Sequence, residues 1–441
     1  MLAYPQISIR NAAMLVSFAA FPALAAPQTA AAAETVLHSF CGSGTTCTGA
    51  TADAHGLIQD SSGNLYGVTG SGGANGKGSV YKLAKSGSSF TYTQLYSFCP
   101  SSGCSDGATP VGALVLDSSG NLYGVTASGG GGCSANPNGC GTIYKLTSSG
   151  TLTTLYSFCP SSGCADGRGP QAGLTYVGAS GGSLYDGLSN LYGTTIAGGT
   201  NDRGTVYKLA SPAPTPVESV LYNFCPSSGC SDGATPGELI TDSSGDIFGV
   251  TLKGGVDGDG DGFADGVVFE LAPSGGSFTY TRLYAFCPSS GCSDGSNPNA
   301  HLVQDGSGNL YGTTNRGGNS TDNGVIFKIV PNGTSSTESV LHSFCTSSGC
   351  PDGAVPQGGL SIDGSGNLFG TAQFDGGNSG GVLFEQSGST YSVLYDFCAQ
   401  SSCSDGKAPD SGAILDSAGK LYGTTAKGGT NDGGVVFKFK P

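Results

Sequence analysis

A phrase of the form Leu-(Tyr/His)-x-Phe-Cys returns seven times along the chain and constrains its fold more than any other feature. Successive phenylalanines of this phrase stand 58, 60, 66, 62, 58 and 53 residues apart. An internal period of this size is typical of a β-propeller or a solenoid. The seven copies end at Cys41, Cys99, Cys159, Cys225, Cys287, Cys345 and Cys398.

Each repeat reads as four short strands. In the second repeat the expected strands cover residues 111–116, 122–126, 142–146 and 153–158, and a turn of the type Asp-Ser-Ser-Gly-Asn follows the first. No stretch of the sequence that is long enough to form a helix shows the 3.6-residue hydrophobic period of one. The sequence therefore predicts an all-β fold, a seven-bladed β-propeller of four-stranded antiparallel blades. A solenoid is the alternative, but its coils usually use fewer residues and parallel pairing.

The two ends of the repeat region predict how the ring closes. The region starts with a strand of the fourth type, Val36–Phe40, and ends with one of the third type, Val435–Phe439. If the fourth strand is outermost, these two strands pair and complete one blade. Such pairing of N- and C-terminal strands would remove an exposed edge.

Residues 1–33 have the pattern of a secretory signal peptide. Arg10 precedes an apolar stretch, Ala12–Leu24, which is too short to span a bilayer as a stable helix. Small-residue cleavage sites follow, so that cleavage is expected after Ala25 or after Ala33. The propeller domain would then cover residues 34–441, with no hydrophobic sorting tail. We expect a secreted or periplasmic protein.

The 16 cysteines fall into local pairs, which predicts disulfide bonds in an oxidising compartment. Zinc is the alternative, but it usually draws on histidine as well, and the chain has four. Each bridge would close a short loop and contribute about 2 kcal/mol. The expected pairs are Cys41/Cys47, Cys99/Cys104, Cys133/Cys140, Cys159/Cys164, Cys225/Cys230, Cys287/Cys292, Cys345/Cys350 and Cys398/Cys403.

Charge and composition exclude several kinds of partner. The formal net charge is -14, from 17 basic and 31 acidic residues, so the chain should repel nucleic acid and anionic membrane surfaces. The 78 glycines recur in fixed blocks beside apolar residues and lack a collagen triplet. Disorder and a collagen helix are therefore not expected.

One acidic segment resembles a calcium-binding loop. It occurs once, in the fourth repeat, with aspartates at alternate positions and glycines between them. Alternate carboxylates can wrap several oxygens around one Ca²⁺. The bidentate glutamate of a complete EF-hand is missing, because Val268 stands at that position. A structural calcium site is predicted, and a flexible acidic loop is the alternative. The predicted ligands are Asp257, Asp259, Asp261, the carbonyl of Phe263, and Asp265.

His55 and His301 are the weak candidates for catalysis. Both lie on predicted innermost strands, where a propeller enzyme would place acid–base groups around its central channel. They stand one residue out of register, however, and strand alternation would turn them to opposite faces. The few glutamates of the chain supply little for an acid–base cluster.

Two repeated features are better explained by architecture than by function. An Asp-Gly step follows six of the cysteine pairs, where aspartate is expected to form a tight turn. Tyrosine and phenylalanine also interchange at two positions of every repeat, which is the pattern of packing between blades. The aspartates are Asp106, Asp166, Asp232, Asp294, Asp352 and Asp405.

The repeated blocks resemble the Gloeo/Verruco (GloVer) repeat family. The resemblance rests on Gly-Asn-Leu-Tyr-Gly-x-Thr, as at Gly63–Thr69, Gly120–Thr126 and Gly308–Thr314, and on a Gly-Gly pair before a strand such as Val435–Lys438. It covers essentially all of residues 34–441. It implies a secreted or surface-associated bacterial protein and no settled biochemical activity.

Three functions remain open at this point. The leading hypothesis is a non-catalytic extracellular binding module for a polysaccharide or a cell-surface protein. The second is a structural component of the envelope or matrix without a small ligand. The third is a lyase or hydrolase with its site in the central channel.

Overall fold

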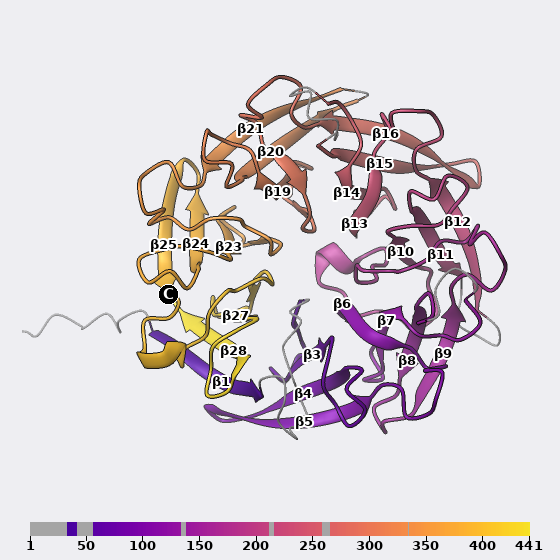
Figure 1. Ribbon diagram of the computed structural model, residues 1–441, viewed down its shortest axis with the longest axis horizontal. Coiled ribbons are helices and arrows are strands. Elements are labelled where there is room, and N and C mark those ends of the chain that lie inside the picture. The colour runs from indigo at the N-terminus through magenta and orange to yellow at the C-terminus, as the bar shows by residue number, and fades with distance from the viewer. Residues whose placement is uncertain (1–32, 42–55, 134–137, 211–215, 258–264, 334) are drawn as a thin grey trace, which may run out of the picture.

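The computed structural model describes residues 33–41, 56–133, 138–210, 216–257, 265–333 and 335–441. Seven small antiparallel sheets stand in a ring around a central axis (Figure 1). The predicted all-β, seven-bladed propeller is confirmed. Short 3-10 turns at Ala179–Gly181 (η1) and Ser401–Cys403 (η2) are the helical elements of the described residues.

Within a blade the strands run in chain order from the axis outwards. Blade 1 contains β2 (Ile58–Gln59), β3 (Leu65–Thr69), β4 (Ser79–Ser86) and β5 (Ser89–Ser97). Blade 2 contains β6 (Ala108–Leu116), β7 (Leu122–Ser128), β8 (Thr142–Leu146) and β9 (Leu152–Ser157). Blade 4 contains β13 (Ala234–Thr241), β14 (Ile247–Lys253), β15 (Val267–Ser274) and β16 (Ser277–Ala285). Blade 6 contains β22 (Ser361–Ile362), β23 (Leu368–Ala372), β24 (Val382–Ser387) and β25 (Thr390–Asp396).

Two blades depart from the four-strand pattern on their inner side. Blade 3 has β10 (Leu191–Thr195), β11 (Thr205–Ala210) and β12 (Val217–Asn223), and its innermost segment keeps only isolated bridges such as Thr175 to Tyr192. Fifteen residues, 176–190, follow that segment in place of a short hairpin turn such as Asp60–Asn64. In blade 5 the inner strand is split into β17 (Ser296–Pro298) and β18 (Val303–Gln304), beside β19 (Leu310–Arg316), β20 (Val325–Asn332) and β21 (Ser335–Ser343).

Blade 7 is completed by the start of the chain, as predicted. Its strands are β26 (Ile414–Leu415), β27 (Leu421–Thr424) and β28 (Asp432–Lys440), and β1 (Ala33–Cys41) pairs antiparallel with β28. Val36 lies opposite Phe437 in that register. The first and last strands therefore close the ring and leave no unpaired edge between them.

In every blade except blade 3, one aspartate builds the hairpin after the inner strand. In blade 1, Oδ1 of Asp60 accepts hydrogen bonds from the backbone N–H groups of Ser62 and Asn64, at 2.9 Å each. Its Oδ2 accepts from Nδ2 of Asn64 (2.7 Å) and from the hydroxyl of Tyr66 (3.0 Å). The repeated Asp-x-x-Gly-Asn-x-Tyr block is thus a turn whose side chains satisfy its own backbone.

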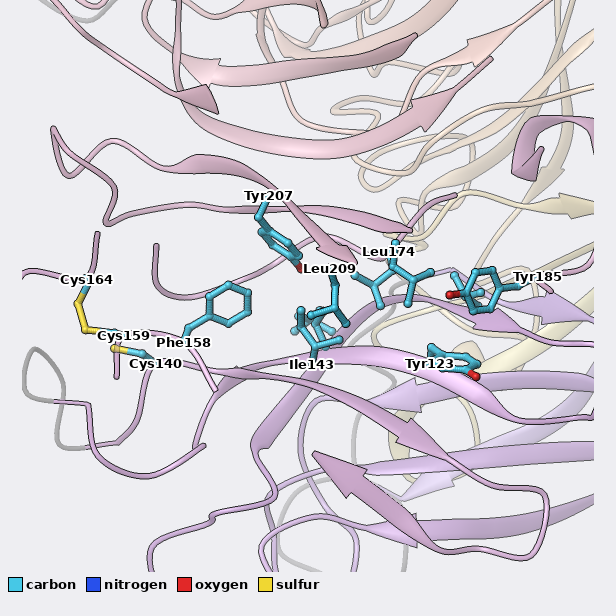
Figure 2. Close-up of a cluster of buried hydrophobic side chains, with 14 residues drawn as sticks. Tyr123, Cys140, Ile143, Phe158, Cys159, Cys164, Leu174, Tyr185, Tyr207 and Leu209 are labelled. Carbon is cyan, nitrogen blue, oxygen red and sulfur yellow. A yellow bond between two sulfur atoms is a disulfide. The ribbon is translucent and has the colours of Figure 1, made fainter. Parts of the chain in front are cut away.

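The core lies between neighbouring blades. The phenylalanine of the repeated phrase is buried in all seven copies, as Phe98 and Phe158 illustrate with 0% and 1% exposure. Figure 2 shows Phe158 of blade 2 packed toward Tyr207 of blade 3, with ring centroids 5.0 Å apart. The third-strand aromatic also lies over the glycine of the neighbouring strand, because a Cβ on Gly193 would stand 2.4 Å from the Tyr207 hydroxyl. Aromatic residues and glycine therefore recur together because they share one space.

Candidate functional site

The innermost segments of all seven blades surround a central cavity of about 630 Å³. Small-molecule sites in proteins usually have volumes of about 300–1,000 Å³. Since each blade contributes the same stretch of its repeat, the lining can be compared position by position. A leucine, replaced by Ala413 in blade 7, packs outwards and serves as the reference.

The residue immediately before that leucine forms a ring around the cavity. Five of its seven members are glycine or alanine, and two are large and polar. The polar members are Glu238 of blade 4 and His301 of blade 5, which are neighbours in the ring. The small members are Gly56, Ala113, Gly173, Gly359 and Gly412.

Close packing explains why most ring members are small. A Cβ on Gly412 would stand 2.2 Å from the carbonyl oxygen of Gly359, and a Cβ on Gly173 would stand 2.7 Å from the carbonyl oxygen of Ala113. Both distances lie far inside van der Waals contact. The architecture therefore requires small residues at these points, and Glu238 and His301 are departures from it.

Glu238 and His301 form an ion pair between two blades. His301 Nδ1 lies 3.2 Å from Oε2 of Glu238, and the side chains are 34% and 26% exposed, respectively. His301 Nε2 lies 3.1 Å from the carbonyl oxygen of Leu360 in blade 6. The imidazole covers Gly359, where a Cβ would stand 2.0 Å from its Cε1 atom. The pair thus joins blades 4 and 5, and blade 6 supplies the carbonyl and the glycine against which the imidazole lies.

The surroundings of His301 favour its charged form. Burial alone lowers the pKa of an imidazole, but here the hydrogen bond and charge of Glu238, together with the Leu360 carbonyl, outweigh burial and raise the pKa of His301 above 6.5. Both ring nitrogens face acceptors, so both must carry a proton to satisfy them. In this state His301 can donate hydrogen bonds but has no lone pair with which to take a proton from a substrate.

A second polar layer lies two residues earlier on the same segments. Three of its six described members are amide side chains, and the other three are Val111, Pro236 and Asp410; we call it the amide layer. The amides are Gln171, Asn299 and Gln357. Gln357 donates a hydrogen bond from Nε2 to Oε1 of Gln373, at 2.8 Å. The other end of the cavity is lined by a mixture of apolar residues, such as Ile240, Ile362 and Ile414, and polar residues, such as Thr175 and Ser361.

The two histidine candidates from the sequence have different outcomes. His301 lies on the cavity wall, between β17 and β18, whereas His55 falls outside the described residues. Sequence reasoning missed Glu238. The signal was present, because a comparison of the seven repeats shows only Glu238 and His301 as large residues before the reference leucine.

The predicted calcium loop is described only at its two ends. Asp259, Asp261 and Phe263 fall outside the described residues, Asp257 is exposed, and Asp265 is buried at 7% exposure. The carboxylate of Asp265 lies within 4.8 Å of the sulfur atoms of Cys287 and Cys292. Calcium binding stays a prediction from the sequence.

The cysteine pairs form disulfide bonds as predicted. Cys41 is also disulfide-bonded, and its predicted partner Cys47 falls outside the described residues. The seven described bridges are Cys99–Cys104, Cys133–Cys140, Cys159–Cys164, Cys225–Cys230, Cys287–Cys292, Cys345–Cys350 and Cys398–Cys403. The described cysteines include none that is free.

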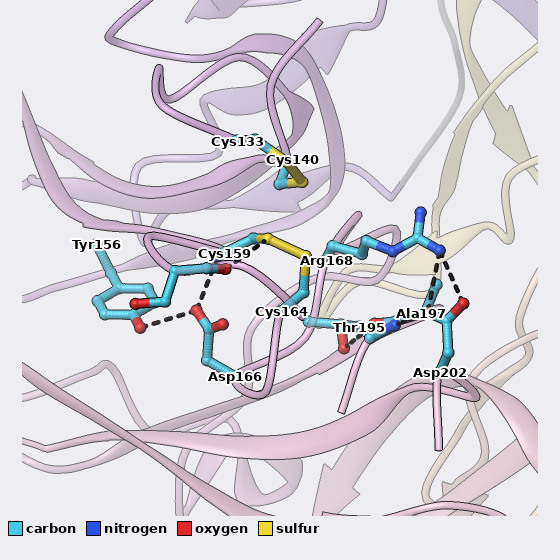
Figure 3. Close-up of a disulfide and its surroundings, with 12 residues drawn as sticks. Cys133, Cys140, Tyr156, Cys159, Cys164, Asp166, Arg168, Thr195, Ala197 and Asp202 are labelled. Atoms are coloured by element: carbon cyan, nitrogen blue, oxygen red, sulfur yellow. Dashed lines mark hydrogen bonds and ion pairs between the residues drawn. A yellow bond between two sulfur atoms is a disulfide. The ribbon is translucent and has the colours of Figure 1, made fainter. Parts of the chain in front are cut away.

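Two of these bridges lie side by side. The four sulfur atoms of Cys133, Cys140, Cys159 and Cys164 stand within 4.8 Å of one another, which is close enough for a shared metal ion (Figure 3). They are instead bonded in pairs as disulfides. So many disulfides are typical of proteins outside the reducing cytosol.

The repeated Asp-Gly aspartates serve the cysteine loops. Asp166 accepts hydrogen bonds at Oδ2 from the backbone N–H of Cys159 (2.8 Å) and from the Tyr156 hydroxyl (2.9 Å), as Figure 3 shows. In blade 5 a histidine replaces the tyrosine, and Nε2 of His342 lies 2.9 Å from Asp352. These carboxylates hold loops together, as the architectural interpretation predicts.

The sequence of the chain matches the model of a known family. The model of the Gloeobacter/Verrucomicrobia repeat matches residues 25–187 and 178–360. The chain belongs to the Gloeobacter/Verrucomicrobia repeat family. Both matched ranges include ring members, and the second includes Glu238 and His301.

Solved structures similar to this family member share too little with it to indicate a function. A puromycin-hydrolysing peptidase of Mycobacterium tuberculosis is 12% identical, with a TM-score of 0.47, over 88% of this chain and 53% of that one. A luciferin-regenerating enzyme is 15% identical, with a TM-score of 0.41, over 75% of this chain and 91% of that one. None of the curated proteins matches the chain. In the described residues, no helix is both long and apolar enough to cross a membrane.

Proposed function

We propose that this protein is a non-catalytic binding module, secreted or periplasmic, that takes a sugar unit of a polysaccharide into its central cavity. One observation carries the proposal. The ring that otherwise accepts only glycine and alanine contains Glu238 and His301, paired and facing the cavity. Large polar residues at a position that favours small ones need a reason beyond architecture, and ligand binding supplies one.

The chemistry of the lining suits a neutral ligand with many hydroxyl groups. Amide side chains both donate and accept hydrogen bonds, as Gln171 and Asn299 can in the second polar layer. The acidic net charge of -14 disfavours an anionic ligand. The Glu238 carboxylate adds a charged acceptor, and its contact with His301 fixes its position. A polyhydroxylated ligand can use all of these groups without burying an unpaired charge.

A hydrolase or lyase is the second candidate, because the contact between Glu238 and His301 is one that acid–base enzymes use. The occupied nitrogens of His301 weigh against it. Turnover of a glycan that ceases in His301→Gln would favour the enzyme. Binding of an unchanged glycan favours the module.

The test is a glycan array with oxidised protein that starts at residue 34. We expect saturable binding in the wild type and at least about a tenfold loss of affinity in Glu238→Gln, because one charged hydrogen bond contributes about 1.5–3 kcal/mol. Glu385→Gln is the matched control, since Glu385 lies on β24 away from the cavity lining. Equal affinity of Glu238→Gln and wild type would show that the ligand does not bind in the central cavity.

Calcium is proposed as a structural ion in the loop that Asp257 and Asp265 delimit. Four carboxylates in one short loop repel one another unless a cation neutralises them. We expect a chelator to lower the melting temperature of the wild type and to leave Asp259→Asn/Asp261→Asn unaffected. An equal response of both proteins to the chelator would contradict this site.

A further inference from the structure

The extra residues of blade 3 reach the axis of the ring. Other blades join their first two strands by a short turn, such as Asp60–Asn64, but blade 3 has residues 176–190 there. The segment carries η1, which Figure 1 draws as a coil near the centre of the ring. It therefore lies where a ligand that passed through the channel would have to go.

Contacts with two neighbouring blades fix this insertion. Ser180 donates a hydrogen bond from Oγ to the carbonyl of Thr241 in blade 4 (2.6 Å), and Thr241 Oγ1 donates back to the carbonyl of Tyr176 (2.7 Å). On the other side Tyr185 is fully buried against Tyr123 of blade 2, with ring centroids 5.1 Å apart. The Tyr185 hydroxyl also donates to the carbonyl of Ser189, at 2.5 Å. The insertion is thus a built part of the fold.

The insertion forms one end of the cavity. Ala179 and Ser180 line it together with Ile240, Ile362 and Ile414, which come from three other blades. The amide layer lies four or five residues earlier on the same innermost segments. The insertion therefore lies at one end of the cavity, and the amide layer lies at the other.

We propose that the insertion makes the cavity single-ended, so that a polysaccharide enters by its terminus through the amide layer and cannot thread through the ring. This inference rests on the proposed function and names the class of ligand more closely. The terminal sugar unit would meet Glu238 and His301 and then stop against Ala179 and Ser180. Internal segments of a long chain would not reach the pair.

The experiment uses the polysaccharide that gives the strongest signal on the array. Partial hydrolysis of that polymer raises the number of chain ends at constant mass. For tenfold more ends we expect the half-saturating mass concentration of the wild type to fall about tenfold, because only ends bind. A half-saturating mass concentration that does not change with the number of chain ends would overturn this inference and leave the proposed binding module intact. Failure to bind any glycan would overturn both.

Two variants test the role of the insertion itself. Replacement of residues 176–190 by the turn of blade 2, Asp117–Asn121, should open the ring and abolish the dependence on chain ends. Ala179→Trp should fill the closed end and weaken binding at least about tenfold. The matched control is Ala418→Trp, in the exposed hairpin turn of blade 7. If Ala179→Trp binds like Ala418→Trp, the closed end is not part of the site, and this conclusion holds even if the loop replacement fails to fold.

Discussion

The His301 imidazole lies against the backbone of Gly359, and its position depends on the missing side chain there. A Cβ at Gly359 would collide with Cε1 and Nδ1 of the imidazole, at 2.0 and 2.1 Å. Overpacking of this kind moves side chains and costs about 1–3 kcal/mol. The pairing of Glu238 and His301 is therefore coupled to a residue that takes no part in the pair.

This coupling predicts the behaviour of Gly359→Ala. The substitution should displace His301 from Glu238 and lower the pKa of His301 toward its ordinary value, because the partner that raises it is lost. The chain has four histidines, so NMR titration can follow each imidazole separately. Gly364→Ala is the control, since a Cβ there meets nothing within 4 Å. A His301 pKa that is the same in both variants would contradict the prediction.

The cysteine loops are the elements that the repeat conserves most regularly along this chain. Cys99 and Cys104 both adopt positive φ angles, 61° and 46°, which cost energy for residues with a side chain. A disulfide and one aspartate hold each loop in that shape. In blade 1, Oδ2 of Asp106 accepts from the Cys99 N–H and from the Tyr96 hydroxyl, at 3.0 Å each.

The disulfide and Asp106 stabilise the same loop, so their contributions to the free energy of unfolding should not be additive. Cys99→Ser/Cys104→Ser should cost about 2 kcal/mol of unfolding free energy. Asp106→Ala should cost about 1–3 kcal/mol, because two donors lose their acceptor. We expect the combined variant to lose less than the sum, measured by urea unfolding, with Ser105→Ala as the neutral control. Strict additivity would show that disulfide and aspartate stabilise different parts of the blade.

Three blades have a buried glutamate in their outermost strand, which should make the stability of the molecule depend on pH. Glu34, Glu218 and Glu338 occupy one register position in blades 7, 3 and 5, and Oε1 of each is buried with no hydrogen-bond partner among the described residues. Burial, and then the charge of Asp405, Asp166 and Asp294 respectively, raises the pKa of each carboxyl from 4.5 to about 7. Each glutamate faces the aspartate of the cysteine loop that leads into its blade.

The sign of the effect on stability follows from these shifts. A group with a raised pKa in the fold contributes stability below its unfolded pKa of 4.5 and loses it as the pH rises through about 7. The free energy of unfolding should therefore fall between pH 4.5 and 7 by about 1–2 kcal/mol per residue, and His301 acts in the same direction. Replacement of all three by glutamine should flatten the profile measured by urea unfolding, and Glu385→Gln should not. A profile that rises from pH 5 to pH 8 in the wild type would contradict this account.

The sequence predicted those features that every repeat shares. Phe98 and its equivalents, the Asp60-type turns and the pairing of β1 with β28 follow from periodicity, since seven copies repeat the same signal. The candidate site instead depends on residues that occur in a single repeat, such as Glu238 in the fourth. Glu238 stands out only when the inner segments of the seven repeats are aligned with one another. These segments are short and apolar, and they resemble one another less than the other strands of the repeat do. The path of residues 176–190 across the ring depends on tertiary contacts with Thr241 and Tyr123, which periodicity does not encode.

The closure of blade 7 has a consequence for the time course of synthesis. Of the described strands, β1 is the first to leave the ribosome and its partner β28 follows the others, close to 400 residues later. At about 5–20 residues per second, the first strand waits roughly 20–80 s for its partner. During that interval six blades can form along the chain while the ring stays open, and the arrival of β28 turns an open arc into a closed ring.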